Sequence, residues 1–131
     1  MILVDTSVWI DHLRKSEPLL VDLMESGLAV CHAFVQGELA LGNLRNRTAI
    51  LVALRGLKWI EVAPDDVILS FIERHNLAGT GIGYIDAHLL VATARTAGST
   101  LWTGDKRLKA LAEGLALAAA DCDTDRSTLV R

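Results

Sequence analysis

The stretch MILVDTS, residues 1–7, joins a short apolar run to a carboxylate and two hydroxyl groups. Ile2 to Val4 predicts a buried strand, and the two hydroxyl residues offer a cap for a helix over Val8 to Arg14. Asp5 stands at the junction between them. Because open parallel sheets form their sites outside the carboxyl ends of the strands, this junction predicts an α/β fold with Asp5 at a site.

The remainder of the chain continues the alternation of apolar strands and helical segments. Further strands are predicted at Leu28 to Cys31, Leu57 to Val62, Thr100 to Trp102 and Leu115 to Ala119. Helices are predicted over Leu19 to Glu25, Phe34 to Gly42, Thr48 to Leu54, Pro64 to about Leu77, Tyr84 to Ala97 and Lys106 to Leu111, with a loop over Gly79 to Gly83. Strands separated by helices predict a three-layer α/β fold, with a central parallel sheet of four to five short strands flanked by helices.

Three further carboxylates interrupt apolar segments as Asp5 does. Glu38 lies inside FVQGELAL, Asp86 lies inside GYIDAHLLV, and Asp105 directly follows LWTG. Like Asp5, Asp105 follows a predicted strand, whereas Glu38 and Asp86 are expected in the first turns of helices that face the same edge of the sheet. Carboxylates are seldom buried unless they are paired, hydrogen-bonded or bound to a cation. The sequence therefore predicts that the four gather into a site for a hard divalent metal ion, Mg²⁺ or Mn²⁺.

Each acid also has a structural explanation when it is taken alone. Asp5 and Asp105 could cap the helices that follow them, Asp86 could start its own helix, and Glu38 could face solvent. Four separate coincidences are then needed to produce the pattern. The joint pattern favours a shared site.

Composition predicts one globular domain, residues 1–131, since 51% of the chain is hydrophobic and 22% is charged. Its apolar runs are shorter than the roughly 20 residues that a membrane helix needs, and no basic segment precedes the first of them. We therefore expect a cytoplasmic protein with no membrane partner. Cys31 and Cys122 are expected to be small buried hydrophobic residues, and the four histidines, which lack metal-binding spacing, are expected to be structural or surface residues.

Four short motifs, in this order and spacing, resemble the PIN-domain ribonucleases. They are VDTS at 4–7, GEL at 37–39, YIDA at 84–87 and TGD at 103–105. The opening MILVDTSVWIDHLR and the length look most like the VapC toxins of bacterial toxin–antitoxin modules, and the resemblance extends from Met1 to about Ala119. It implies a PIN-like fold, with Asp5, Glu38, Asp86 and Asp105 as the acidic quartet and Thr6 or Ser7 and Thr103 as supporting hydroxyls.

The resemblance implies a metal-dependent endoribonuclease, and the chemistry of the acids agrees with it. Clustered carboxylates bind Mg²⁺ or Mn²⁺, and such an ion can activate water for attack on a phosphodiester. Asp5, Asp86 and Asp105 are expected to hold the metal, and Glu38 is expected to ligate it or to orient the water. The products would be a 5′-phosphate and a 3′-hydroxyl. Many relatives carry a further acid where this chain has Lys106-Arg107, so we expect one tightly bound ion.

Contact with RNA is expected to be local, because the net charge of −3 becomes nearly neutral when the four site acids are set aside. The candidate phosphate contacts are Arg45, Arg47, Lys106 and Arg107, which could equally be solvated helix residues. One alternative function is a non-catalytic binding module with the same fold. Another is a metal-dependent phosphatase of the haloacid dehalogenase type, which requires a second Asp where this chain has Ser7.

The resemblance further implies a cognate VapB-like antitoxin and a homodimer. The segments Val8 to Leu13, Leu19 to Met24 and Val35 to Leu44 carry more apolar residues than one face against a small sheet can bury. They predict a groove next to Glu38 that accepts an amphipathic antitoxin helix, with Leu41 as a contact residue.

Overall fold

The computed structural model describes residues 1–120, and Cys122 lies outside this range. Its centre is a parallel sheet with the strand order β3-β2-β1-β4. The strands are β1 (Ile2–Val4), β2 (Ala29–Cys31), β3 (Lys58–Trp59) and β4 (Thr100–Trp102). Ile2 pairs with Ala29 on one side and with Thr100 on the other. The α/β fold with a central parallel sheet is as predicted.

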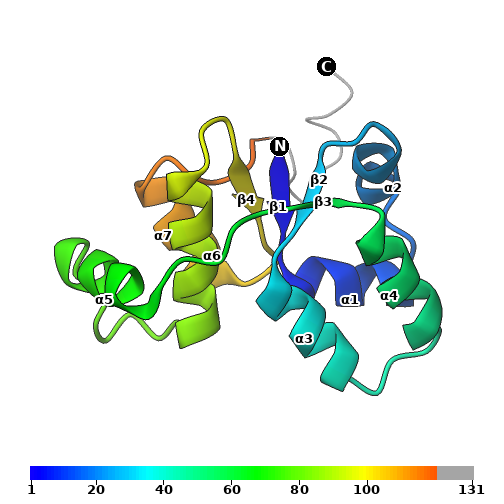
Figure 1. Ribbon diagram of the computed structural model, residues 1–131, viewed down its shortest axis with the longest axis horizontal. Helices are drawn as coiled ribbons and strands as arrows, with labels where there is room; N and C mark the ends of the chain where they lie inside the picture. Colours follow the sequence, from blue (N-terminus) through cyan, green and yellow to red (C-terminus); the bar gives the residue numbers. More distant parts are fainter. Residues whose placement is uncertain (121–131) are drawn as a thin grey trace.

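Helices cover both faces of this sheet. They are α1 (Thr6–Arg14), α2 (Pro18–Glu25), α3 (Ala33–Leu41), α4 (Arg47–Arg55), α5 (Asp65–Arg74), α6 (Tyr84–Arg95) and α7 (Lys106–Gly114). Figure 1 shows α1, α2 and α4 on one side of the strands and α5, α6 and α7 on the other. The three-layer arrangement follows from parallel connections, because each crossover must carry the chain back along a face of the sheet. No helix in the described range is both long and apolar enough to cross a membrane.

The predicted third strand is shorter in the structure than expected, and the predicted last strand does not form. The third strand was expected over Leu57 to Val62, but only Lys58–Trp59 forms regular strand. After Ile60 donates a backbone hydrogen bond to Cys31, the chain leaves the sheet and crosses toward α5 (Figure 1). At Leu115 to Ala119 only an isolated parallel bridge forms, between Leu101 and Ala118. Both segments lie at edges of the sheet, where a strand can pair with a neighbour on one side only. Fewer backbone hydrogen bonds therefore hold them in the sheet.

The start of α1 also differs from the expectation. The helix begins at Thr6, and Asp5 is its N-cap, with its carboxylate accepting a hydrogen bond from the backbone N–H of Thr6. The hydroxyls of Thr6 and Ser7 are therefore not the cap. They are free to bond carboxylates of the site.

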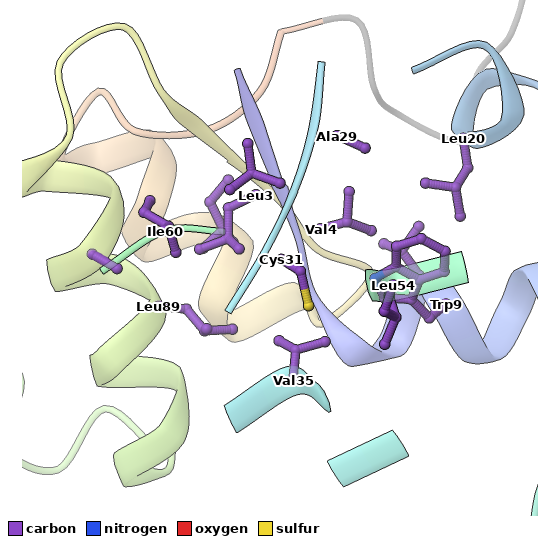
Figure 2. Packing of buried hydrophobic residues seen from close by; sticks show 14 of the residues in the cluster. Leu3, Val4, Trp9, Leu20, Ala29, Cys31, Val35, Leu54, Ile60 and Leu89 are labelled. Atoms are coloured by element: carbon purple, nitrogen blue, oxygen red, sulfur yellow. The ribbon is translucent and has the colours of Figure 1, made fainter. Parts of the chain in front are cut away.

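The core lies on both faces of the strands. In Figure 2, Leu89 from α6 lies on one side of β1 and β2, and Trp9 and Leu54 lie on the other. Cys31 of β2 is fully buried among them, and burial raises the pKa of its thiol to about 12. Cys31 is therefore a small core residue, as expected, and is unreactive at neutral pH. This packing holds the carboxyl ends of the strands in place, where the predicted site acids lie.

Candidate functional site

The four predicted acids come together at the carboxyl edge of the sheet. Asp5 directly follows β1, and Asp105 lies at the N-cap of α7, just beyond β4. Asp86 is the third residue of α6. Glu38 lies in the second turn of α3, one turn later than expected.

Electrostatic coupling shows how close these groups are. Burial raises the pKa of Asp86 above its ordinary value, and the hydrogen bond from Gly83 opposes this shift. The negative charges of Asp5, Asp105 and Glu38 each raise the pKa of Asp86 further. Coulombic coupling of this kind requires short separations. Four segments that are distant in sequence thus place their carboxylates near enough for the other three charges to act on Asp86.

Asp5 is the most enclosed of the four, with an exposed fraction of only 6%. Its Oδ2 atom accepts hydrogen bonds from the hydroxyls of Ser7, at 2.9 Å, and Thr103, at 2.7 Å. The Thr103 hydroxyl in turn accepts the backbone N–H of Asp105 at 3.0 Å. The backbone N–H of Gly104 donates to Ser7 Oγ at 3.0 Å. These bonds hold the end of β1 next to the end of β4. They also give the buried carboxylate of Asp5 hydrogen-bond donors in place of water.

Glu38 is held from the opposite side of the site. Its side chain is exposed, and its Oε1 atom accepts a hydrogen bond of 2.7 Å from the Thr6 hydroxyl. Thr6 adjoins Asp5 in the chain, so this bond draws the end of α3 toward the start of α1. All three predicted supporting hydroxyls, Thr6, Ser7 and Thr103, thus contact a predicted acid.

Asp86 and Asp105 each use one oxygen for helix capping. Asp86 Oδ2 accepts the backbone N–H of Gly83 at 3.1 Å. Asp105 Oδ1 accepts the backbone N–H groups of Arg107 and Leu108 at 2.9 and 3.0 Å. The capping explanation and the shared site therefore hold together, because a cap engages one carboxylate oxygen and orients the other.

The donor set fits a hard divalent cation in its chemistry. It consists of carboxylate and hydroxyl oxygens, and the charges of the other acids add to the effect of burial in raising the pKa of Asp86. Within residues 1–120, however, no three Asp, Glu, His or Cys side chains are placed so that they could hold a metal ion together. Hydrogen bonds hold several of the carboxylate oxygens instead. The acids thus match such an ion in type and charge without forming a closed coordination shell.

The four predicted phosphate contacts divide into different environments. Arg47 donates from Nε to the carbonyl of Ala40 at 2.8 Å and so ties α3 to α4. The side chain of Arg107 lies against the loop before α6, since a Cβ atom at Gly81 would be 2.8 Å from its Nη1 atom. Arg45 and Lys106 are exposed. Of these four residues, Arg107 is the one whose side chain contacts the loop that leads into α6, the helix that carries Asp86.

Two histidines that belong to the elements carrying Glu38 and Asp86, namely His32 at the N-cap of α3 and His88 in α6, are buried. His32 is fully buried and caps α3, with its Nδ1 atom accepting the backbone N–H of Phe34 at 3.0 Å. Burial, and to a smaller extent the proximity of His88, lowers the pKa of His32 to about 4. The ring of Phe34 packs against both histidines. His32 is therefore neutral at physiological pH.

A contact that sequence reasoning missed fixes Tyr84 at the start of α6. Its hydroxyl donates to Asp65 Oδ1 at 2.8 Å, and this bond raises the pKa of the phenol. Its ring packs edge-on against His88, with centroids 4.8 Å apart. Asp65 and Tyr84 belong to different helices, so no local pattern in the sequence signals the pair.

Comparisons with known proteins agree with this geometry. Residues 2–114 match the family model of the PIN domain. The chain is 47% identical over 120 residues to the protein named Ribonuclease VapC32 in two strains of Mycobacterium tuberculosis, CDC 1551 / Oshkosh and ATCC 25618 / H37Rv. Each alignment covers 90% of this chain and 97% of the relative. The fold is similar to that of PAE2754 from Pyrobaculum aerophilum, with a TM-score of 0.55, 18% identity, and coverage of 86% of this chain and 80% of that one.

Proposed function

The chain belongs to the VapC-type ribonucleases of the PIN-domain family, and we infer that it is an endoribonuclease that cleaves RNA phosphodiesters at its acidic quartet, Asp5, Glu38, Asp86 and Asp105. The observation that carries the assignment to these residues is the set of hydrogen bonds that links three of the acids, from Glu38 through Thr6 to Asp5 and from Asp5 through Thr103 to Asp105. Helix capping alone would not join these separate elements. Asp86 is assigned with them because burial and then the charges of the other three acids raise its pKa.

We propose that Asp5, Asp86 and Asp105 hold a divalent metal ion, Mg²⁺ or Mn²⁺, directly or through water. When bound, such an ion supplies charge stabilisation at the phosphate and makes water a better nucleophile. The carboxylate of Glu38, held by Thr6, ligates the ion or orients the attacking water. A bond forms between the water oxygen and phosphorus while the bond from phosphorus to O3′ breaks. The products are a 5′-phosphate and a 3′-hydroxyl.

The supporting hydroxyls act by positioning. Ser7 and Thr103 donate to one oxygen of Asp5 and keep this buried side chain oriented. Arg107 and Lys106 follow Asp105 and are proposed to contact RNA phosphates. Arg45 is proposed as a further contact, and Arg47 contributes through its bond at the end of α3.

VapC toxins pair with VapB antitoxins, and we propose that the antitoxin binds next to Glu38. The surface there includes Leu41, whose side chain is 90% exposed at the end of α3. An exposed leucine beside a charged site fits an amphipathic helix from a partner. A basic side chain of that partner would pair with the acidic quartet. A homodimer is also proposed from the family resemblance.

The direct test is cleavage of total RNA in Mg²⁺ by the wild type, by Asp5→Asn and by Asp22→Asn. Asp22 is an exposed residue of α2, so its variant has the same change of charge away from the site. We expect Asp5→Asn to lose cleavage by orders of magnitude while remaining folded, and Asp22→Asn to match the wild type.

Normal cleavage by Asp5→Asn would remove this residue from the mechanism. RNA binding without cleavage by the wild type would instead favour the alternative of a non-catalytic binding module. The phosphatase alternative has less support, because Ser7 occupies the place of its second Asp and donates a hydrogen bond to Asp5.

A further inference from the structure

A second concave surface adjoins the acidic quartet. It is a pocket of about 260 Å³ that is lined by residues of α5, of α6 and of the loop that joins these helices. The loop can be followed from α5 to α6 at the lower left of Figure 1. Its walls include Ile72, Leu77, Ala78, Ile82, Tyr84 and Ala87. No charged side chain lines it. We call it the loop pocket.

The loop pocket is connected to the site through Gly83. This residue lines the pocket, and its backbone N–H donates to Asp86 Oδ2 at 3.1 Å. Ala87, which also lines the pocket, directly follows Asp86 in α6. A molecule in the loop pocket therefore lies against the segment that positions a carboxylate of the quartet.

Tyr84 presents an immobilised aromatic surface in this pocket. Its side chain is 45% exposed although it is aromatic. The hydroxyl is held by Asp65 at 2.8 Å, and the ring packs against buried His88. An exposed ring that is fixed at both ends loses little entropy when a flat partner stacks on it.

A positive charge flanks the same loop. Gly81 has a φ of +89°, and a Cβ atom there would be 2.8 Å from Arg107 Nη1, so only glycine allows the arginine this position. The guanidinium of Arg107 thus lies against the loop at Gly81, while the backbone N–H of the same residue donates to Asp105 Oδ1 at 2.9 Å. An apolar pocket with an aromatic wall beside an arginine has the two features that single-stranded nucleic acids require, a surface for the base and a charge for the phosphate.

We propose that the loop pocket binds one nucleobase of the RNA, next to the phosphodiester that is cleaved, with the base against Tyr84 and an adjacent phosphate at Arg107. The inference rests on the proposed ribonuclease function and adds a subsite that holds one base next to the cleaved bond. A nucleobase is an uncharged ring, so it suits a pocket with uncharged walls. A phosphate does not suit this pocket, because it would lose its hydration without gaining a charged partner there.

The test uses binding of short fluorescent RNAs by anisotropy, without metal, in the Asp5→Asn background so that the RNA stays intact. Tyr84→Ala removes the ring, and Ala78→Trp fills the pocket from an exposed wall position. Tyr84→Phe keeps the ring without the hydroxyl. Leu69→Ala, at an apolar residue of α5 that is 56% exposed and does not line the pocket, is the matched control.

We expect Tyr84→Ala and Ala78→Trp each to weaken RNA binding roughly tenfold, as loss of one stacked base does, with Tyr84→Phe and Leu69→Ala near the parent. A series of RNAs with a single abasic nucleotide should reveal one position at which the parent loses affinity. At that position the two pocket variants should lose nothing further. Ala78→Trp keeps the test informative if Tyr84→Ala fails to fold.

Unchanged binding of intact and abasic RNA by both pocket variants would overturn the inference, and the ribonuclease assignment would stand on the cleavage by wild-type protein. Conversely, absence of cleavage by the wild type, with the abasic effect present, would overturn the ribonuclease assignment and leave the base pocket. The two proposals therefore fail by different measurements.

Discussion

Replacement of Thr103 by valine should weaken both the fold and the activity. The substitution keeps the shape of the side chain but removes the hydroxyl that donates to Asp5 Oδ2 at 2.7 Å and accepts the backbone N–H of Asp105 at 3.0 Å. Thr103 and Asp5 are both buried, each with an exposed fraction of 6%, so water replaces the lost bonds poorly. A buried hydrogen bond to a charged group contributes about 1.5–3 kcal/mol, and we expect the free energy of unfolding to fall by about 2 kcal/mol.

The measurement is urea unfolding of the metal-free protein, together with RNA cleavage in Mg²⁺. Thr93→Val is the matched control, because Thr93 is also buried, but its hydroxyl donates only to a carbonyl within its own helix, Leu89 O, at 2.8 Å. We expect the control to unfold within about 0.5 kcal/mol of the wild type and to cleave RNA normally. Cleavage by Thr103→Val should fall at least tenfold. Equal stabilities of the two variants would refute the argument that the bonds to Asp5 hold the site together.

Three further predictions concern pH, metal and partner. The pKa of His32 is lowered to about 4 in the folded protein, so as the pH falls the unfolded chain takes up a proton before the folded chain does. The free energy of unfolding should therefore fall between about pH 6.5 and pH 4, and this group should account for up to about 3 kcal/mol of the fall. His32→Asn keeps a cap for α3, and urea unfolding across this range should show a shallower fall; an unchanged slope would exclude His32 as its source. Titration calorimetry of the free protein should detect one tightly bound Mg²⁺, because Lys106 and Arg107 follow Asp105 where a further acid would serve a second ion, and two full sites without RNA would contradict this. Leu41→Glu should abolish antitoxin binding in a pull-down while RNA cleavage by the free toxin persists, since Leu41 is 90% exposed and makes no part of the quartet; undiminished affinity would place the partner elsewhere.

Local chemistry made much of the fold predictable. The strand at Thr100 to Trp102 was predicted at its observed bounds, because three apolar or β-branched residues lie between a glycine turn and a capping aspartate. The four acids could be singled out for a similar reason, since a carboxylate inside an apolar run conflicts with its surroundings unless a site compensates. The start of α1 was the exception. Asp5 and the hydroxyls that follow it are all good caps, and neighbouring residues alone do not decide between them.

The sequence by itself determined the alternation of strands and helices and the identity of the conspicuous acids. Only the tertiary structure decided the strand order, which brings Thr103 into contact with Asp5 across 98 positions of the chain. It also decided that Arg47 bonds the carbonyl of Ala40, that Arg107 lies against Gly81, and that Tyr84 meets Asp65 beside a pocket. Periodicity and capping are properties of residues within one or two turns of each other. Contacts between crossovers depend on how whole elements pack, which no single stretch of the chain encodes.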